Sequence, residues 1–112
     1  MSSYNLESVE EMAGGDQDFV KVVVQTFLEE IPPDLEGMNQ AITQDNPAQA
    51  YQYAHKMKPN FQMFGLGLMD QIKVLEGWAK VGDSKEGVNE AARIITDRYK
   101  KAERDLKADF DL

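Results

Sequence analysis

Residues 46–64 read NPAQAYQYAHKMKPNFQMF, and the spacing of their apolar side chains decides the fold. Apolar positions recur after three or four residues, which is the repeat of one face of a helix and not of a strand. Asn46 and Pro47 form a helix-start signal, because an Asx side chain caps free amides and proline suits the first helical turn. The stretch therefore predicts a helix over 47–64. Its expected core stripe is Ala50, Ala54, Met57, Phe61 and Phe64.

The same periodicity continues on both sides of this stretch. The expected core stripes there are Val20, Val24, Phe27, Ile31, Leu35, Met38 and Ile42 before it, Leu68, Ile72, Leu75 and Ala79 after it, and Val88, Ala92, Ile95, Tyr99, Ala102 and Leu106 in the last helix. Turn signals, chiefly glycines and Asx–proline steps, separate the apolar stripes, and Asp16 is expected to cap the helix that follows Gly14-Gly15. The expected elements are a leader helix over about 5–13 and bundle helices over about 16–44, 47–64, 68–81 and 84–109. Short loops make successive helices antiparallel neighbours. The chain is therefore predicted to be all-α, a single domain over residues 1–112 that folds as an up-down-up-down four-helix bundle with a short N-terminal leader helix.

At two places the sequence leaves the secondary structure open, and at a third it marks where a helix begins. Pro32 and Pro33 allow either a new helix that starts at the second proline or one long helix that continues with a kink. The run 19–24 is rich in β-branched residues, so a strand is an alternative there, although no partner strand lies nearby in the sequence. Asp83 and Glu86 form a variant of the capping box that is expected to begin the last helix.

Composition excludes several classes of function. The chain has 112 residues, of which 42% are hydrophobic and 29% charged, and these values are typical of one globular domain. Its 20 acidic residues against 12 Lys and Arg give a formal charge of −8, which argues against nucleic-acid binding and favours a monomer. The absence of cysteine excludes disulfides, thiolate nucleophiles and cysteine zinc sites. With no signal peptide and no apolar run near the about 20 residues of a membrane span, we expect no membrane association and a cytoplasmic location.

The single histidine, His55, is predicted to face away from the core. At about 100° per residue it lies about 130° from the centre of the core stripe. The side chains expected in its column are Tyr51, Lys58, Pro59 and Gln62. Residues 46–69 contain no Asp or Glu, although the frequency of acids in the whole chain predicts about four, and Lys56 and Lys58 are the only charges there. This segment is therefore either a buried central helix or a functional face.

Elimination favours phosphorus chemistry at His55. With no second histidine and no cysteine, a nucleophilic triad is excluded. No metal-ligand spacing and no glycine-rich phosphate loop occur, so we expect no metal site and no bound cofactor. An ordinary imidazole keeps a free ring nitrogen at cellular pH and can attack phosphorus without a base. Lys58 lies one turn further on and is placed to neutralise phosphoryl oxygens, while Gln62 is a candidate hydrogen-bond donor.

The segment Ala54-His55-Lys56-Met57-Lys58, followed by Phe64-Gly65, resembles the AHxLKG…LG motif of histidine-containing phosphotransfer (Hpt) domains. Nearly the whole chain shares the resemblance. The further matches, in chain order, are Leu6 with Val9, Gly14-Gly15-Asp16, Phe27 to Pro32, and the helix break at Gly82-Asp83. Four positions depart from the family pattern: Met57 replaces leucine, Pro59 replaces glycine, and Asn60 and Phe61 replace the small residues that usually follow the glycine.

The resemblance implies a phosphorelay carrier that has no kinase activity of its own. His55 would accept a phosphoryl group from an aspartate of one response-regulator receiver domain and pass it to an aspartate of another. Lys58 would support the phosphoryl group, and Gly65 would close the motif. The receiver would bring the Mg²⁺, and a hybrid sensor histidine kinase is a further candidate partner.

Docking of a receiver needs an apolar patch near the histidine with polar residues around it. Met12, Phe19 and Val22 are the candidates for this patch, because the resemblance implies docking on the leader and on the start of the next helix. The alternative is that these side chains only widen a core-facing arc. The other residues expected to contact the partner are Tyr51, Lys56 and Pro59.

Two other functions compete with the carrier. The first is a module that binds receivers without transfer, because Pro59 distorts the site. Proline cannot donate an amide hydrogen to the carbonyl of His55, and its ring adds bulk beside the histidine. The second is an unrelated helical adaptor, which a buried His55 would favour. Trp78 and the tyrosines Tyr4, Tyr53 and Tyr99 are expected to pack in or at the edge of the core.

Overall fold

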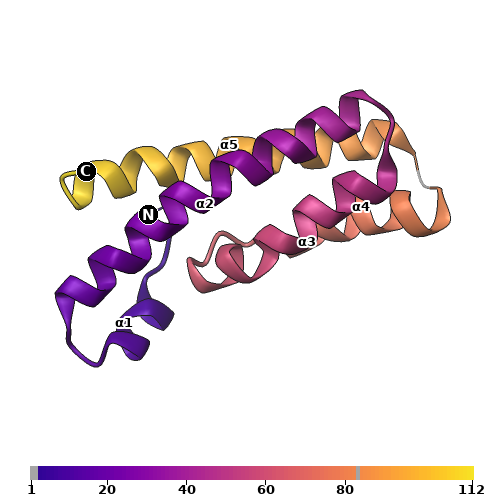
Figure 1. Cartoon of the computed structure of the whole chain (residues 1–112). Helices are drawn as coiled ribbons and strands as arrows, with labels where there is room; N and C mark the ends of the chain where they lie inside the picture. Colours follow the sequence, from indigo (N-terminus) through magenta and orange to yellow (C-terminus); the bar gives the residue numbers. More distant parts are fainter. Residues whose placement is uncertain (1–2, 83) are drawn as a thin grey trace.

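The computed structural model describes residues 3–82 and 84–112, which form five helices (Figure 1). The helices are α1 (Glu7–Ala13), α2 (Gln17–Thr43), α3 (Pro47–Met63), α4 (Met69–Val81) and α5 (Lys85–Asp109). The predicted all-α architecture is confirmed, with the leader helix and four longer helices in the expected order. Four of the ten helix ends agree with the predicted bounds, five differ by one residue, and the leader begins two residues later than expected, at Glu7.

Side-chain caps explain where α2 and α3 begin. The Asp16 side chain accepts hydrogen bonds from the amides of Asp18 and Phe19, at 3.0 and 3.2 Å. The Asn46 side chain accepts one from the amide of Gln49 at 3.2 Å, and Pro47 follows as the first helical residue. These bonds satisfy amides that have no partner within the helix. The caps predicted at both positions are therefore confirmed.

The two prolines of α2 do not start a new helix. The helix runs without a break through Pro32 and Pro33, so the alternative of two helices is wrong. The alternative of a strand over 19–24 is also wrong, because that run lies in the same helix. Tertiary packing outweighs the weak local preference in both cases: Val20, Val24 and Ile31 are buried.

The cap predicted at Asp83 lies outside the described residues. The N-cap of α5 is Ser84, whose side-chain oxygen accepts a hydrogen bond from the amide of Glu86 at 3.2 Å. Lys85 also forms an ion pair with Asp45, in the turn between α2 and α3. The last helix is therefore capped by a serine and attached to a distant turn.

The four long helices lie side by side and alternate in direction (Figure 1). Each contacts the next along the chain, and α5 closes the bundle against α2. α1 packs against α2 near the connection between α3 and α4 (Figure 1). The amide of Asn5 donates to the carbonyl of Phe64 at 2.8 Å, and Val9 is fully buried. The leader is therefore attached both to α2 and to the end of α3.

The core runs along the bundle and consists of the predicted stripes. All five residues expected on the α3 stripe are buried, as are those expected on α2 and α5. On α4 the stripe is completed by Trp78 rather than by the predicted Ala79, which is half-buried. Tyr99 is buried, and Tyr4 and Tyr53 pack at the core edge, as expected. Within this core the rings of Phe27 and Phe64 are stacked, with 3.9 Å between the ring centroids and 13° between the ring planes.

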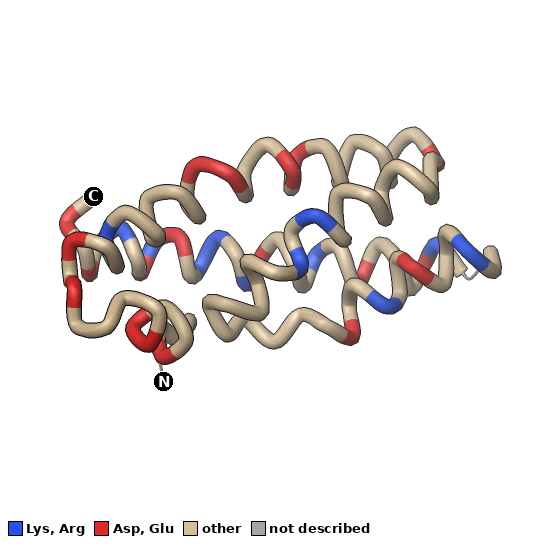
Figure 2. Tube along the Cα trace, turned by 60° about the horizontal axis from the view of Figure 1, so that its bottom comes forward, with Lys and Arg blue, Asp and Glu red and all other residues tan. Residues whose placement is uncertain are grey.

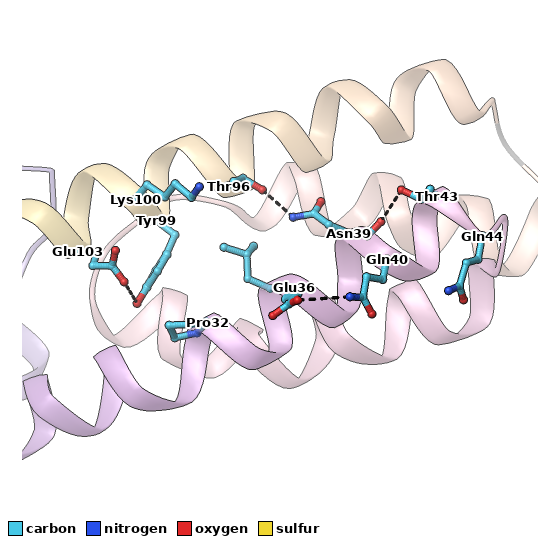
Figure 3. Close-up of a pocket in the computed structure, with 11 residues that line it drawn as sticks. Pro32, Glu36, Asn39, Gln40, Thr43, Gln44, Thr96, Tyr99, Lys100 and Glu103 are labelled. Carbon is cyan, nitrogen blue, oxygen red and sulfur yellow. Dashed lines mark hydrogen bonds between the residues drawn. The ribbon is translucent and has the colours of Figure 1, made fainter.

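A groove of about 580 Å³ follows the seam between α2 and α5 (Figure 3). Leu35, Pro32 and Tyr99 contribute apolar surface to it. The Asn39 side chain crosses the seam and donates to the Thr96 hydroxyl at 3.2 Å. His55 and its column lie on α3 and do not line this groove.

Within the described residues no helix is both long and apolar enough to cross a membrane.

Candidate functional site

The outward face of α3 carries the single histidine. His55, Pro59 and Gln62 are exposed, while Tyr51 and Lys58 are half-buried. The interpretation of this helix as wholly buried is therefore wrong, and the predicted outward direction of His55 is confirmed. The core stripe on the other side of α3 is buried along its whole length. One helix thus presents the histidine to solvent and is held by the core behind it.

Tyr51 packs beside the histidine. The two ring centroids are 5.6 Å apart, with 45° between the ring planes. The Tyr51 hydroxyl donates a hydrogen bond to Glu76 Oε2 of α4 at 2.7 Å, and this bond raises the pKa of the tyrosine. The Lys80 ammonium lies 5.7 Å from the centre of the Tyr51 ring. Tyr51 therefore connects the histidine to two charged residues of the next helix.

Glu76 and Lys80 are site residues that the sequence analysis missed. The Lys80 ammonium nitrogen lies 4.0 Å from Glu76 Oε2, and the two residues stand on successive turns of α4. The hydrogen bond from Tyr51 lowers the pKa of Glu76, Lys80 lowers it further, and Lys58 and His55 act in the same direction. The segment around His55 has no acid in the sequence, but the α3–α4 hairpin brings one from outside it. In the sequence, the only indication of these two residues is their i,i+4 spacing on one helix, which suits an ion pair.

The two lysines of α3 differ in their surroundings, although both give this helix its purely basic charge (Figure 2). Lys56 pairs with Asp34 of α2 at 3.2 Å, where the carboxylate side chain is only 11% exposed. Within residues 3–82 and 84–112, Lys58 forms no ion pair. Lys56 therefore binds the neighbouring helix, and Lys58 keeps its charge available on the histidine face.

Gln62 lies one helical turn beyond Lys58, in the last turn of α3. Its side-chain nitrogen is 3.3 Å from the sulfur of Met69, a weak acceptor. The side chain is exposed, so this contact leaves it accessible to a partner. It shares the outward face with His55, as its position in the predicted column requires.

Gly65 has the left-handed backbone conformation, with φ of +66°. A Cβ atom there would lie 2.7 Å from the Cβ of Asn5, which is closer than real Cβ contacts. The glycine therefore lets the leader segment approach the end of α3, where Asn5 donates to the carbonyl of Phe64. From the other side, Arg98 donates to the carbonyl of Gly67 at 2.8 Å and holds the same loop.

Met12, Phe19 and Val22 are exposed by 57%, 42% and 56%. They are not core residues, so the alternative that they widen a core-facing arc is wrong. They lie on α1 and on the first turns of α2, whereas the histidine column lies on α3. We call these two sets of residues the histidine face (Tyr51, His55, Lys58, Pro59 and Gln62) and the leader patch (Met12, Phe19 and Val22).

Pro59 lies inside α3, which continues to Met63. Because proline has no amide hydrogen, the carbonyl of His55 lacks its helical donor. We expect Pro59→Ala to raise the free energy of unfolding by about 1–3 kcal/mol, since the lost bond and the clash of the ring are both removed. Urea unfolding monitored by circular dichroism measures this change, with Pro47→Ala at the first helical turn as the control. A Pro59→Ala variant that is less stable than the wild type would contradict this account.

The arrangement fits attack by the exposed imidazole of His55 with positive charge nearby. In the part of the chain that the structure describes, no three His, Cys, Asp or Glu side chains converge to hold an ion.

Comparison with protein families finds that residues 22–95 match the Hpt domain, and this range includes the whole histidine face. No curated protein and no solved structure matches the chain.

Proposed function

Since this chain belongs to the Hpt domain family, which implies histidine phosphotransfer in phosphorelays, we propose that His55 carries a phosphoryl group between receiver domains. The observation that supports this assignment best is the exposure of the only histidine on the outward face of α3. Lys58, one turn away and without an ion pair in the described chain, supplies positive charge on the same face. The rest of the surface is mainly acidic, with a net charge of −8 for the chain.

The transfer requires no group beyond those of the two proteins and the receiver's Mg²⁺. The lone pair of the free ring nitrogen of His55 attacks the phosphorus of an aspartyl phosphate on the receiver. An N–P bond forms as the P–O bond to the aspartate breaks, and the aspartate leaves as a carboxylate. The same steps in reverse deliver the group to a second receiver. Lys58 neutralises the phosphoryl oxygens in both directions, and Gln62 donates a hydrogen bond to them.

A receiver that reaches His55 covers the histidine face and extends to the leader patch. Tyr51, Lys56 and Pro59 are exposed or half-buried around the histidine, so they are the polar and bulky rim of the contact. The leader patch supplies the exposed apolar surface that a transient complex buries. A second candidate function, docking without transfer, is favoured by the bulk of Pro59 beside the histidine.

The test is transfer from a panel of phosphorylated receiver domains to the wild-type chain. We expect label that is labile in acid and stable in base, the signature of phosphohistidine. Because the chain has one histidine, such label points to His55. Receiver binding without label would replace the carrier with the docking module, and the absence of both would remove the proposed function.

Lys58→Ala is expected to slow transfer by about 10²-fold, the usual cost of removing one group that stabilises charge in a transition state. The matched control is Lys101→Ala on α5. It removes the same charge from an exposed lysine that belongs neither to the histidine face nor to the leader patch, so it should transfer at nearly the wild-type rate. Single-turnover transfer rates of both variants measure this contrast. Equal rates for the two variants would contradict the role given to Lys58.

A further inference from the structure

Glu76 is an acidic residue fixed beside the phospho-acceptor, on a face that is otherwise basic. It accepts a 2.7 Å hydrogen bond from Tyr51, whose ring lies against His55 with 5.6 Å between centroids. The α3–α4 contact therefore holds the carboxylate at a defined place near the histidine. A solvated acid elsewhere on α4 would not have this constraint.

The charged and titratable groups around this point are Tyr51, His55 and Lys58 of α3, and Glu76 and Lys80 of α4. Glu76 is ionised at neutral pH, because the Tyr51 hydrogen bond and the nearby cations lower its pKa. The Lys80 ammonium lies 4.0 Å from the Glu76 carboxylate, and the two side chains are 64% and 44% exposed, so solvent weakens this ion pair. A negative charge therefore remains close to the place that a phosphoryl group would occupy.

We propose that Glu76 is a positioning residue that disfavours the phosphorylated form of His55 and so drives the phosphoryl group onward to a receiver. The proposal rests on the proposed function, because it concerns the same histidine. Phosphorylation adds about two negative charges to the histidine side chain. Repulsion from the Glu76 carboxylate raises the free energy of this product more than that of the free histidine. Glu76 also attracts Lys58, which reduces the positive charge offered to the phosphoryl oxygens.

The test compares the wild type with Glu76→Gln, which keeps an oxygen that accepts from Tyr51 and removes only the charge. With one receiver that exchanges with the wild type, we expect the equilibrium ratio of phosphorylated to free His55 to rise about threefold to tenfold. Labelling by phosphoramidate, a small anionic donor that loses ammonia as the N–P bond to His55 forms, should become faster by about the same factor. Both gains should shrink at high ionic strength.

The controls separate charge at this site from general effects. Glu90→Gln on α5 makes the same charge change at an exposed carboxylate paired with Arg93, and it should leave the ratio within about twofold of the wild type. Glu76→Asp keeps the charge and should return the ratio toward the wild-type value. Loss of a merely structural contact would lower labelling and could not raise it.

The outcomes distinguish this inference from the proposed function. Labelling of the wild type with an unchanged or lower ratio in Glu76→Gln would overturn the role of Glu76 and leave the carrier intact. An equal gain in Glu90→Gln would overturn it as well, since net charge would then explain the effect. A wild type that takes no label from phosphoramidate or from any receiver would overturn both.

Discussion

His55→Gln is expected to carry no acid-labile phosphoryl label, a loss of at least about 10³-fold in transfer from any receiver that labels the wild type. Glutamine has a similar polarity but no ring nitrogen that can attack phosphorus. Because His55 is exposed, the variant should fold with a stability within about 0.5 kcal/mol of the wild type. Transfer assays with the same panel of phosphorylated receivers measure the loss.

Receiver binding by the same variant shows whether the loss of transfer comes from the missing acceptor or from weaker docking. The leader patch and most of the histidine face are unchanged, so affinity measured by calorimetry should stay within about threefold. If His55→Gln retained wild-type labelling, the acceptor would be another residue, and a nearby lysine would be the first candidate. The variant would then refute the role of His55 and leave the family fold unaffected.

Phe64→Ala is expected to lower the free energy of unfolding by about 3–5 kcal/mol. Phe64 is fully buried at the last turn of the histidine-bearing helix and stacks on Phe27 with 3.9 Å between centroids. Its removal leaves a cavity between α2 and α3 that the surrounding rings cannot fill. Because a domain of this size is stable by only about 5–15 kcal/mol, the variant should be largely unfolded at moderate urea concentrations. Circular dichroism in urea measures the shift of the midpoint.

Phe19→Ala is the matched control, since it makes the same chemical change at a phenylalanine that is 42% exposed. We expect a loss of stability below about 1 kcal/mol, together with weaker binding of receivers if the leader patch is the docking surface. Equal destabilisation by the two substitutions would contradict the placement of Phe64 in the core and Phe19 outside it.

The sequence predicts the bundle well because its helices are amphipathic. The apolar stripe of α3 recurs every three or four residues, and all of it is buried. The same count places His55 on the outward side, so one half of the site follows from helical geometry alone. Asp16 and Asn46 also cap as expected, because capping depends on residues next to each other in the chain.

The parts that could not be predicted depend on how one helix lies against another. Glu76 and Lys80 reach Tyr51 only through the rotation and register of α4 against α3, which periodicity does not specify. The different surroundings of Lys56 and Lys58 likewise depend on Asp34 of α2. For the same reason, the continuity of α2 through its prolines is decided by the core that it covers and not by local preference.

The backbone bond between Asn5 and Phe64 has a consequence for how partner choice can evolve. It attaches the leader, which carries Met12, to the end of the helix that carries His55, and a Cβ atom at position 65 would collide with Asn5. Main-chain contacts therefore fix where the leader lies relative to the end of α3. Under the proposed function, exposed side chains on the leader can change, and with them the preferred receiver, while the position of the leader stays constant.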